Sequence, residues 1–459
     1  MSDTRSEILH SMQMVAPPGQ VELDGDALLK LRGLTNELTE CSREEAKEEF
    51  ERFIGVAERS LDLREDKLGN QLADKKVLVT GGTGCIGSAL LRELVKYGPQ
   101  AIVSISRGVT LPRQTTEGVD YRHVDIRSRN TTKEVIGKVE PDIIYHLAAQ
   151  HNPSLAETEV NRTLATNIFG TQNLLDAAKE VEVPQIIYAS TGKALRPYTP
   201  DVYASSKKVS EWLMAKAASE SRLTCSGVRF THVVDNSLIF KRIQHWIDTD
   251  SPIRLHGSNI LFYMQSARES AHLLLNAGLE ADVSNFRIEA IRDLEWPVNL
   301  VDLALGAIIR RKADTPIYIA GYEQGYEEVP YPGLYDPKYS GELSPLVSAF
   351  EAPQAQHSPT CRQVDSFPFD IETTSEMEDS LAQLKLACSQ DKSNTDLRHL
   401  EEDLSWEMWQ GRLCRVPFPT LERSIKQMTR YPNYDQLPPE HIRTSEMVRK
   451  AFESRNQIL

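Results

Sequence analysis

The sequence KKVLVTGGTGCIGSALLRELVKY, residues Lys75–Tyr97, carries the strongest structural signal in the chain. A short apolar run stops at Thr80, three glycines follow at Gly81, Gly84 and Gly87, and an amphipathic segment then begins. This order predicts a strand, a tight turn and a helix. Glycines at this spacing let the backbone turn sharply and approach a pyrophosphate, while the helix N-terminus faces the anion. We therefore predict a dinucleotide-binding site here.

The composition indicates an acidic globular protein. The 459 residues are 40% hydrophobic and 26% charged, with a formal net charge of -14. Because no run of lysine or arginine breaks this acidic background, general binding to nucleic acid or anionic membranes is disfavoured, and we expect small-molecule partners. The six cysteines form no CxxC pair, and neither a signal core nor an apolar run that spans a bilayer is evident. We therefore expect a cytoplasmic protein with free thiols.

Residues 1–70 are predicted to form a helical N-terminal appendage. Met1–Asp24 contains proline and glycine breakers and is expected to be a flexible lead-in. A leucine-rich helix should follow, and a second helix should open at Ser42, with Glu45 completing a capping box. We expect the apolar faces of these helices to pack on the next domain or on a second copy, and so predict a homo-oligomer.

Residues 71–350 are predicted to form an α/β domain with a doubly wound, Rossmann-type parallel sheet, whose smaller substrate-binding part covers about 230–350. Strands and helices alternate with short connections, and the strands are rich in valine and isoleucine. Besides Val77–Val79, the expected strands are Ala101–Ser106, Tyr121–Val124, Ile143–His146, Gln185–Ala189 and Ser226–Phe230. The expected helices are Thr132–Val139, Arg162–Lys179 and Val202–Ala218.

The last hundred residues differ from the rest of the chain in amino-acid composition. Residues 351–378 are rich in Pro, Ser, Thr and Gln and are predicted to be a linker. Residues 379–459 are predicted to form a C-terminal helical appendage, with Trp406, Trp409, Phe418 and Leu421 in a small packed unit. No repeat and no metal-ligand spacing is evident there, and the sequence does not indicate what this part does.

Tyr203 and Lys207 form a candidate catalytic pair, because residues four apart on a helix project from one face. An ammonium beside a phenol should lower the pKa of the phenol, which could then take a proton from a hydroxyl while hydride leaves the same carbon. This spacing also occurs on ordinary helix surfaces. Here, however, it follows the glycine turn and a predicted strand that ends at Ser190 and Thr191.

From about Lys75 to Glu328 the chain resembles the extended short-chain dehydrogenases/reductases, and within them the polysaccharide-biosynthesis branch that includes UDP-N-acetylglucosamine 4,6-dehydratases. The matching motifs, each with its first residue, are TGGTGCIG (Thr80), SISRG (Ser104), VDIR (Val124), HLAAQHNPSLAE (His146), TNIFGTQNLLDAA (Thr166), STGKALRP (Ser190) and YASSK (Tyr203). They cover a little over half of the chain.

The resemblance implies a nicotinamide cofactor. Arg107 stands where an acidic residue would indicate NAD, so we expect NADP, with NAD and a purely solvated role for Arg107 as alternatives. The implied cofactor-binding residues are Gly81, Thr83, Gly84, Cys85, Ile86, Gly87, Ser106, Arg107, Asp125, Ile126, Leu147, Ala148, Ala149, Asn167, Ser190, Tyr203 and Lys207.

The resemblance also implies the catalytic roles. Tyr203 would be the base, Lys207 its partner and a ribose contact, and Thr191 a hydrogen-bond donor to the reacting oxygen. Lys193 would take the proton beside the new ketone. The aspartate that helps to expel a hydroxyl in these dehydratases is replaced by Gly192, which puts dehydration in doubt, and Asp201 is an alternative acid.

The substrate pocket departs from the family pattern. Ser237, Leu261 and Glu323 stand where the family clamps a nucleotide diphosphate with arginines. We therefore hypothesise a sugar-like alcohol of lower negative charge, including an amine-bearing one, with His151, Thr191, His232 and Glu323 as substrate contacts. The alternative is that Arg196, Arg242 or Arg268 rebuilds the clamp.

These observations predict an NADP-dependent enzyme in which Tyr203 starts the oxidation of a secondary alcohol on a sugar or nucleotide sugar. The outcome would be epimerisation, dehydration or net oxidation. One alternative is a plain dehydrogenase acting on a non-nucleotide sugar-like substrate. The other is a non-catalytic regulatory protein that binds the cofactor.

Overall fold

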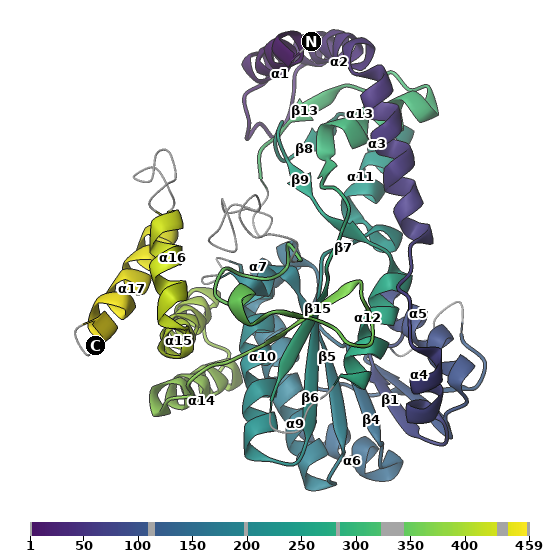
Figure 1. The fold of residues 1–459 in the computed structure, drawn as a ribbon. Coiled ribbons are helices and arrows are strands. Elements are labelled where there is room, and N and C mark those ends of the chain that lie inside the picture. The colour runs from purple at the N-terminus through teal and green to yellow at the C-terminus, as the bar shows by residue number, and fades with distance from the viewer. Residues whose placement is uncertain are drawn as a thin grey trace. The chain divides into compact units, whose positions relative to one another are not determined.

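The computed structural model describes residues 2–108, 115–196, 201–280, 285–322, 344–428 and 439–456 (Figure 1). The chain divides into two units. The small unit holds the described parts of Met1–Arg59, His232–Ala267 and Leu294–Glu327, and the sheet unit those of Ser60–Thr231, Arg268–Asp293 and Glu328–Leu459. Among the described residues, every helix is too short or too polar to cross a lipid bilayer.

A nine-stranded sheet forms the centre of the sheet unit, in the order β14-β15-β11-β6-β5-β4-β1-β2-β3. All neighbours from β11 to β3 are parallel, whereas β15 is antiparallel to β11 and to β14. The parallel strands are β1 (Lys76–Thr80), β2 (Ala101–Ser106), β3 (Val119–His123), β4 (Ile143–His146), β5 (Gln185–Thr191), β6 (Thr224–Phe230) and β11 (Arg287–Ile291). The direction of winding reverses between β1 and β4, and ligands of such sheets bind where it does.

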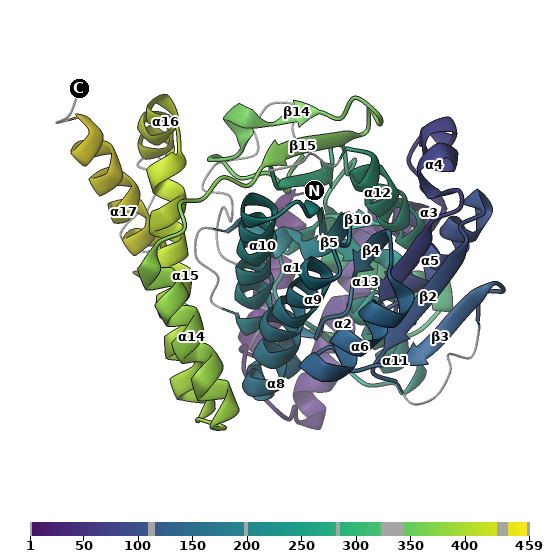
Figure 2. The ribbon, with the colours of Figure 1, turned by 90° about the horizontal axis from the view of Figure 1, so that it is seen from below.

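Helices lie on both faces of this sheet, with α6, α9 and α10 on one face and α5 and α12 on the other (Figure 2). The helices before and between the strands are α4 (Glu65–Leu72), α5 (Cys85–Leu94), α6 (Arg129–Val139), α7 (Pro153–Thr158), α8 (Val160–Leu164), α9 (Gly170–Glu180), α10 (Val202–Glu220) and α12 (Ala267–Leu279). The predicted doubly wound α/β fold is confirmed, and each predicted strand falls on an observed one. The helix predicted over Arg162–Lys179 is interrupted by a π-helical turn at Ala165–Phe169.

The N-terminal helices are part of the small unit. Its helices are α1 (Ser2–Val15), α2 (Gly25–Cys41), α3 (Arg43–Gly55), α11 (Leu238–Asp248) and α13 (Leu300–Arg311). Its strands form three pairs, which are β7 (His232–Val233) with β10 (Met264–Gln265), β8 (Ile253–Leu255) with β13 (Ile317–Ile319), and β9 (Leu261–Phe262) with β12 (Val298–Asn299). Apolar residues of α1, α2 and α3 share one core with those of α13. The predicted division at residue 70 therefore differs from the structure.

Two local predictions for this region were wrong. The expected flexible lead-in contains α1, because Ile8 and Met12 are buried in the core of the small unit. The capping box at Ser42 is absent, since no side-chain bond caps α3 there. Instead, the Ser42 hydroxyl accepts a hydrogen bond from Arg5 Nη1 at 3.1 Å, and Arg5 also pairs with Asp302 at 2.7 Å.

The predicted linker at 351–378 contains two strands of the main sheet, β14 (Gln356–His357) and β15 (Val364–Pro368). The helices that follow are α14 (Ser375–Ser389), α15 (Asn394–Arg415), α16 (Phe418–Met428) and α17 (Pro439–Asn456). Trp406, Trp409 and Leu421 are buried in one apolar cluster, as predicted, and Phe418 stacks on Phe452 with 4.8 Å between ring centroids. These helices belong to the sheet unit.

Close packing of α13 on α3 generates a testable prediction for stability. A Cβ at Gly306 would lie 2.4 Å from the carbonyl oxygen of Ala46, whereas one at Gly137 in α6 would meet nothing within 4 Å. We expect Gly306→Ala to lower the free energy of unfolding by about 2 kcal/mol, because the two helix backbones must separate. The matched control Gly137→Ala should raise it by up to about 1 kcal/mol. Urea denaturation measures both, and an equal effect at the two sites would contradict the packing.

Candidate active site

The glycine turn between β1 and α5 is closed against the end of β4. Gly81 has a φ of +75°, and a Cβ on it would lie 2.9 Å from the Ala148 nitrogen. A Cβ on Gly87 would lie 2.3 Å from the carbonyl oxygen of Gly81. Both positions therefore require glycine, because neighbouring backbone occupies the space of a side chain. A glycine turn packed this tightly before a helix N-terminus is the kind of turn that binds a pyrophosphate. Thr83, Gly84, Cys85 and Ile86 complete the turn and begin α5.

A buried hydrogen-bond chain holds the ends of β1 and β4 together. Thr80 Oγ1 accepts from the backbone nitrogens of Leu147 and Ala148 at 3.1 and 3.0 Å, and it lies 2.7 Å from His146 Nδ1. Burial lowers the pKa of His146 to about 3, so this imidazole is neutral. Leu147, Ala148 and Ala149 are partly exposed directly after β4. The predicted cofactor residues of these two strands therefore meet at one edge.

Positive charge gathers beside the ends of β2 and β3. Ser106 ends β2, Arg107 follows it, and Asp125 and Ile126 follow β3. Burial and the nearby cations Arg162 and Arg127 lower the pKa of the Arg107 guanidinium. Asp125 is engaged by Arg127, whose Nη2 lies 2.6 Å from Asp125 Oδ2. An anionic group here would meet Arg107 with two further arginines close to it.

Asn167 joins the loop after β4 to helix α10. It lies in the π-helical turn, a feature that is frequent at functional sites. Its Nδ2 donates to the Gln150 carbonyl at 3.2 Å and to Ser206 Oγ at 2.9 Å, and its Oδ1 accepts from the Gln150 nitrogen at 2.8 Å. Because all these partners are buried, the side chain holds the cleft wall in one arrangement.

Tyr203 is the one partly exposed residue between Asp201 and Met214, where every neighbour is buried. Asp201 caps α10 by accepting from the Ala204 nitrogen at 2.7 Å, which places Tyr203 in the first turn. Burial raises the pKa of Tyr203 to about 12, although a hydrogen bond to the Thr191 side chain opposes the shift. The structure therefore brings Tyr203 and Thr191 together at the carboxyl end of β5.

Lys207 lies beneath this pair. Its Nζ donates to the carbonyl of Ala189 and stands 4.3 Å from the centroid of the Tyr188 ring. Burial lowers the pKa of Lys207 to about 7, while the Glu211 carboxylate opposes the change. The pKa of Tyr203 is raised and not lowered as predicted, because burial of the phenol outweighs its hydrogen bond to Thr191.

A side chain at position 192 would require Leu346 to move. A Cβ on Gly192 would lie 2.6 Å from Leu346 Cδ2 and 3.3 Å from the Phe230 carbonyl oxygen. Lys193 follows in the same short turn and is partly exposed. A buried leucine thus fills the space into which an aspartate side chain would project.

The predicted substrate contacts are divided between the two units of the chain. His151 is exposed after β4, and His232 begins β7 in the small unit, where its ring centroid lies 5.1 Å from that of Phe262. Glu323 lies outside the described residues. Of the alternative clamps, Arg196 is buried with Nη1 3.9 Å from Asp201, and Arg268 faces Glu93 in the last turn of α5, at the end away from the glycine turn.

Sequence reasoning missed a buried ion network that adjoins the candidate pair Tyr203 and Lys207. Ser190 Oγ donates to Glu211 Oε1 at 2.6 Å, and Glu211 pairs with Arg229 at 2.9 Å. Arg229 pairs in turn with Glu351 at 2.8 Å, and Glu351 with Arg412 at 3.0 Å. One signal was visible, because Glu211 follows Lys207 by one helical turn on the face of Tyr203. Nothing local marks Glu351 or Arg412.

Known proteins are similar to this chain in sequence and in fold. A family model described as polysaccharide biosynthesis protein matches residues 77–329. Capsular polysaccharide biosynthesis protein CapD of Staphylococcus aureus is 27% identical over 301 residues, which is 62% of this chain and 49% of that protein. UDP-N-acetylglucosamine 4,6-dehydratase (inverting) of Campylobacter jejuni is 30% identical over 175 residues, 35% of this chain and 49% of that enzyme.

Among solved structures, that of Pen from Bacillus thuringiensis has a TM-score of 0.55 at 22% identity, and the match covers 66% of this chain and 90% of that one. This likeness confirms the fold. The chain spans about half the length of the capsular polysaccharide protein and of the inverting dehydratase.

The glycine turn generates a binding prediction. Gly81→Ala should abolish detectable NADP binding by calorimetry, because the new Cβ must displace the chain after β4. Gly98→Ala is the matched control, since Gly98 also has a positive φ, +62°, but no atom within 4 Å of its Cβ position. It should lose about 1 kcal/mol of stability and keep its affinity. Equal affinity in both variants would show that the turn does not hold the cofactor.

Proposed function

Because the chain belongs to the polysaccharide biosynthesis protein family, a branch of the extended short-chain dehydrogenases/reductases, we propose that it is an NADP-dependent enzyme that oxidises a secondary alcohol of a sugar or nucleotide sugar. The observation that carries this proposal is the placement of Tyr203, which is accessible at the carboxyl end of β5, bonded to Thr191 and followed one turn later by Lys207. A phenol in this position can reach a substrate hydroxyl that lies in the crevice.

Each residue of the constellation has one task in the proposed reaction. When bound, the cofactor accepts hydride from the carbon that bears the hydroxyl. Tyr203 takes the hydroxyl proton, and Thr191 donates a hydrogen bond to the same oxygen. Burial raises the pKa of the phenol to about 12. The proposal therefore requires a positive charge beside Tyr203 that lowers this pKa during the reaction, and Lys207, when protonated, is the residue that would supply it.

The proposed reaction ends in epimerisation or net oxidation rather than dehydration. Expulsion of a hydroxyl requires an acid, but position 192 is glycine and Leu346 occupies the adjoining space. Lys193 remains as a base that can remove the proton next to the new ketone. Asp201 is an unsuitable substitute, because it is buried and caps α10.

A non-nucleotide substrate is the second candidate, favoured by one observation. Of the three arginines that could rebuild a diphosphate clamp, Arg196 is buried with Nη1 3.9 Å from Asp201, the exposed Arg268 lies 3.9 Å from Glu93, and the Arg242 guanidinium lies 5.0 Å from the centroid of the Trp246 ring. Without bidentate hydrogen bonds from arginine side chains, a diphosphate loses strong charge-assisted contacts. A neutral or amine-bearing sugar alcohol would not need them.

Removal of the Tyr203 hydroxyl tests the proposed chemistry. Tyr203→Phe should lower the turnover of UDP-N-acetylglucosamine, UDP-glucose and a free amino sugar by at least roughly a hundredfold, with NADP affinity kept within about twofold. The absorbance of reduced nicotinamide and mass spectrometry of the products give the readout. Tyr97→Phe, which removes a surface hydrogen bond to Glu65, is the control. Full activity of Tyr203→Phe would favour a regulatory, non-catalytic protein.

Arg107 supports NADP as the cofactor and provides a separate test. Arg107→Ala should raise the dissociation constant for NADP at least about tenfold, because a charge-assisted bond to the 2′-phosphate is lost, and should leave that for NAD unchanged. The exposed Arg92→Ala serves as the control for net charge. An equal loss for both nucleotides would contradict the assignment.

A further inference from the structure

Helix α15, in the part of the chain that the sequence left without a role, packs along the catalytic helix α10. The ring of Trp409 on α15 lies 6.0 Å from Lys208 Nζ on α10. On the same side of α10, the indole nitrogen of Trp212 donates to Thr373 at 3.0 Å. The helix that carries Tyr203 is therefore contacted by Trp409 of α15 and by Thr373 in the segment that leads into α14.

One contact reaches the first turns of α10. Glu401 on α15 accepts a hydrogen bond from Ser205, which stands between Tyr203 and Lys207 in the sequence, and both partners are buried. Near the N-terminus of α15, Arg398 forms an ion pair with Glu157. Glu157 Oε1 in turn accepts a hydrogen bond from the backbone nitrogen of Val202, the first residue of α10, at 2.8 Å. Helix α15 thus touches the start of α10 by two routes.

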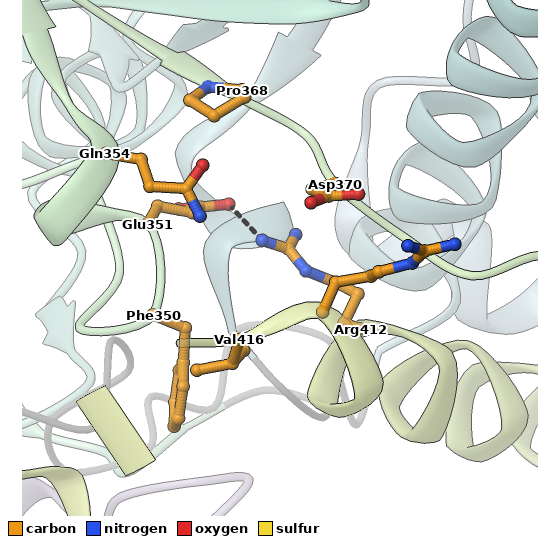
Figure 3. A pocket seen from close by; sticks show the side chains of 8 residues that line it. Phe350, Glu351, Gln354, Pro368, Asp370, Arg412 and Val416 are labelled. Atoms are coloured by element: carbon orange, nitrogen blue, oxygen red, sulfur yellow. Dashed lines mark hydrogen bonds and ion pairs between the residues drawn. The ribbon is translucent and has the colours of Figure 1, made fainter. Parts of the chain in front are cut away.

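A second contact reaches the strand beneath the site. Arg412 Nη2 donates to Glu351 Oε1 at 3.0 Å, as Figure 3 shows, and Arg229 donates to the same carboxylate at 2.8 and 3.0 Å. Arg229 also holds Glu211 with two bonds of 3.0 and 2.9 Å. Glu211 then accepts from Ser190. The chain of bonds runs from α15 to the residue before Thr191.

The four charges of this network balance, with two arginines and two glutamates, all buried. Burial opposes ionisation of Glu351, but Arg229 and Arg412 outweigh it and lower its pKa to about 2. Removal of one member would leave an uncompensated buried charge, to which the remaining partners must adjust. Because Ser190 adjoins Thr191 and Glu211 follows Lys207, such an adjustment displaces the groups at the reacting centre.

We propose that α15 positions the catalytic helix and strand β5, with Arg412 as the positioning residue at its end. This inference rests on the proposed function of Tyr203, and it gives the C-terminal helices a role in catalysis. Arg412 touches no reacting atom and acts through Glu351 and Arg229.

The test compares Arg412→Met with Arg415→Met in the full-length protein. Arg415, three residues on, is 52% exposed and pairs loosely with Glu372 at 3.6 Å, so it is a matched control. For Arg412→Met we expect kcat to fall roughly tenfold to a hundredfold with KM within about twofold, because misplacement acts on the chemical step. Arg412→Lys, which keeps the charge, should restore most of kcat.

Hydrogen exchange of the peptide over 201–214 gives a second readout that needs no substrate. It should rise several-fold in Arg412→Met relative to Arg415→Met. If Arg412→Met fails to fold, the comparison of Arg412→Gln with Arg415→Gln replaces it, with a loss of kcat expected only in the former.

Two results separate this inference from the proposed function. If the wild type turns over a sugar probe while Arg412→Met matches Arg415→Met in both kcat and exchange, the positioning role is overturned. If the wild type converts none of the three sugar probes, the proposed function fails, and faster exchange confined to Arg412→Met still supports the coupling of α15 to α10.

Discussion

The burial of Arg229 between two carboxylates is the constraint on which the sheet unit depends. Burial alone would lower the pKa of Arg229, but Glu211 and Glu351 outweigh it and raise that pKa above its usual range. A guanidinium without solvent is tolerated only when its donors are paired in this way. The arrangement fixes β6 to α10 on one side and to the segment around Glu351 on the other, so the catalytic helix and its strand share one anchor.

The segment around Glu351 also contributes Leu346, which lies beside Gly192 in the candidate site. Leu346 lies close to the position of a Gly192 side chain, and its carbonyl accepts from Arg229 at 3.4 Å. Leu346 therefore connects the ion network to the space beside Gly192, because its carbonyl bonds Arg229 and its side chain fills that space. Because an apolar side chain lies beside Gly192, a Gly192→Asp substitution requires Leu346 to move.

Local rules were sufficient for the parallel strands β1, β2, β4, β5 and β6 and for the glycine turn. These strands are short, mostly apolar runs bounded by turns, and the positions of Gly81 and Gly87 follow from close backbone approach, so their sequence signals are strong. Tyr203 and Lys207 were proposed as a pair for the same reason, since their spacing is a property of one helix.

The rest depends on contacts between residues far apart in the sequence. Ser42 has the sequence of a capping box, but Arg5 takes its hydroxyl. The polar stretch at 351–378 contains β15, which pairs with β11 through backbone bonds that composition does not reveal. The pKa of Tyr203 was predicted to fall because the sequence shows its charged neighbour and hides its burial.

The central claim is that a nicotinamide ring lies beside the hydroxyl of Tyr203. A crystal structure of the full-length protein grown with NADP tests it most directly. The account predicts the pyrophosphate against the turn at Gly81 and the nicotinamide ring beside the hydroxyl of Tyr203. A cofactor bound elsewhere, or a Tyr203 side chain turned away from the ring, would contradict it.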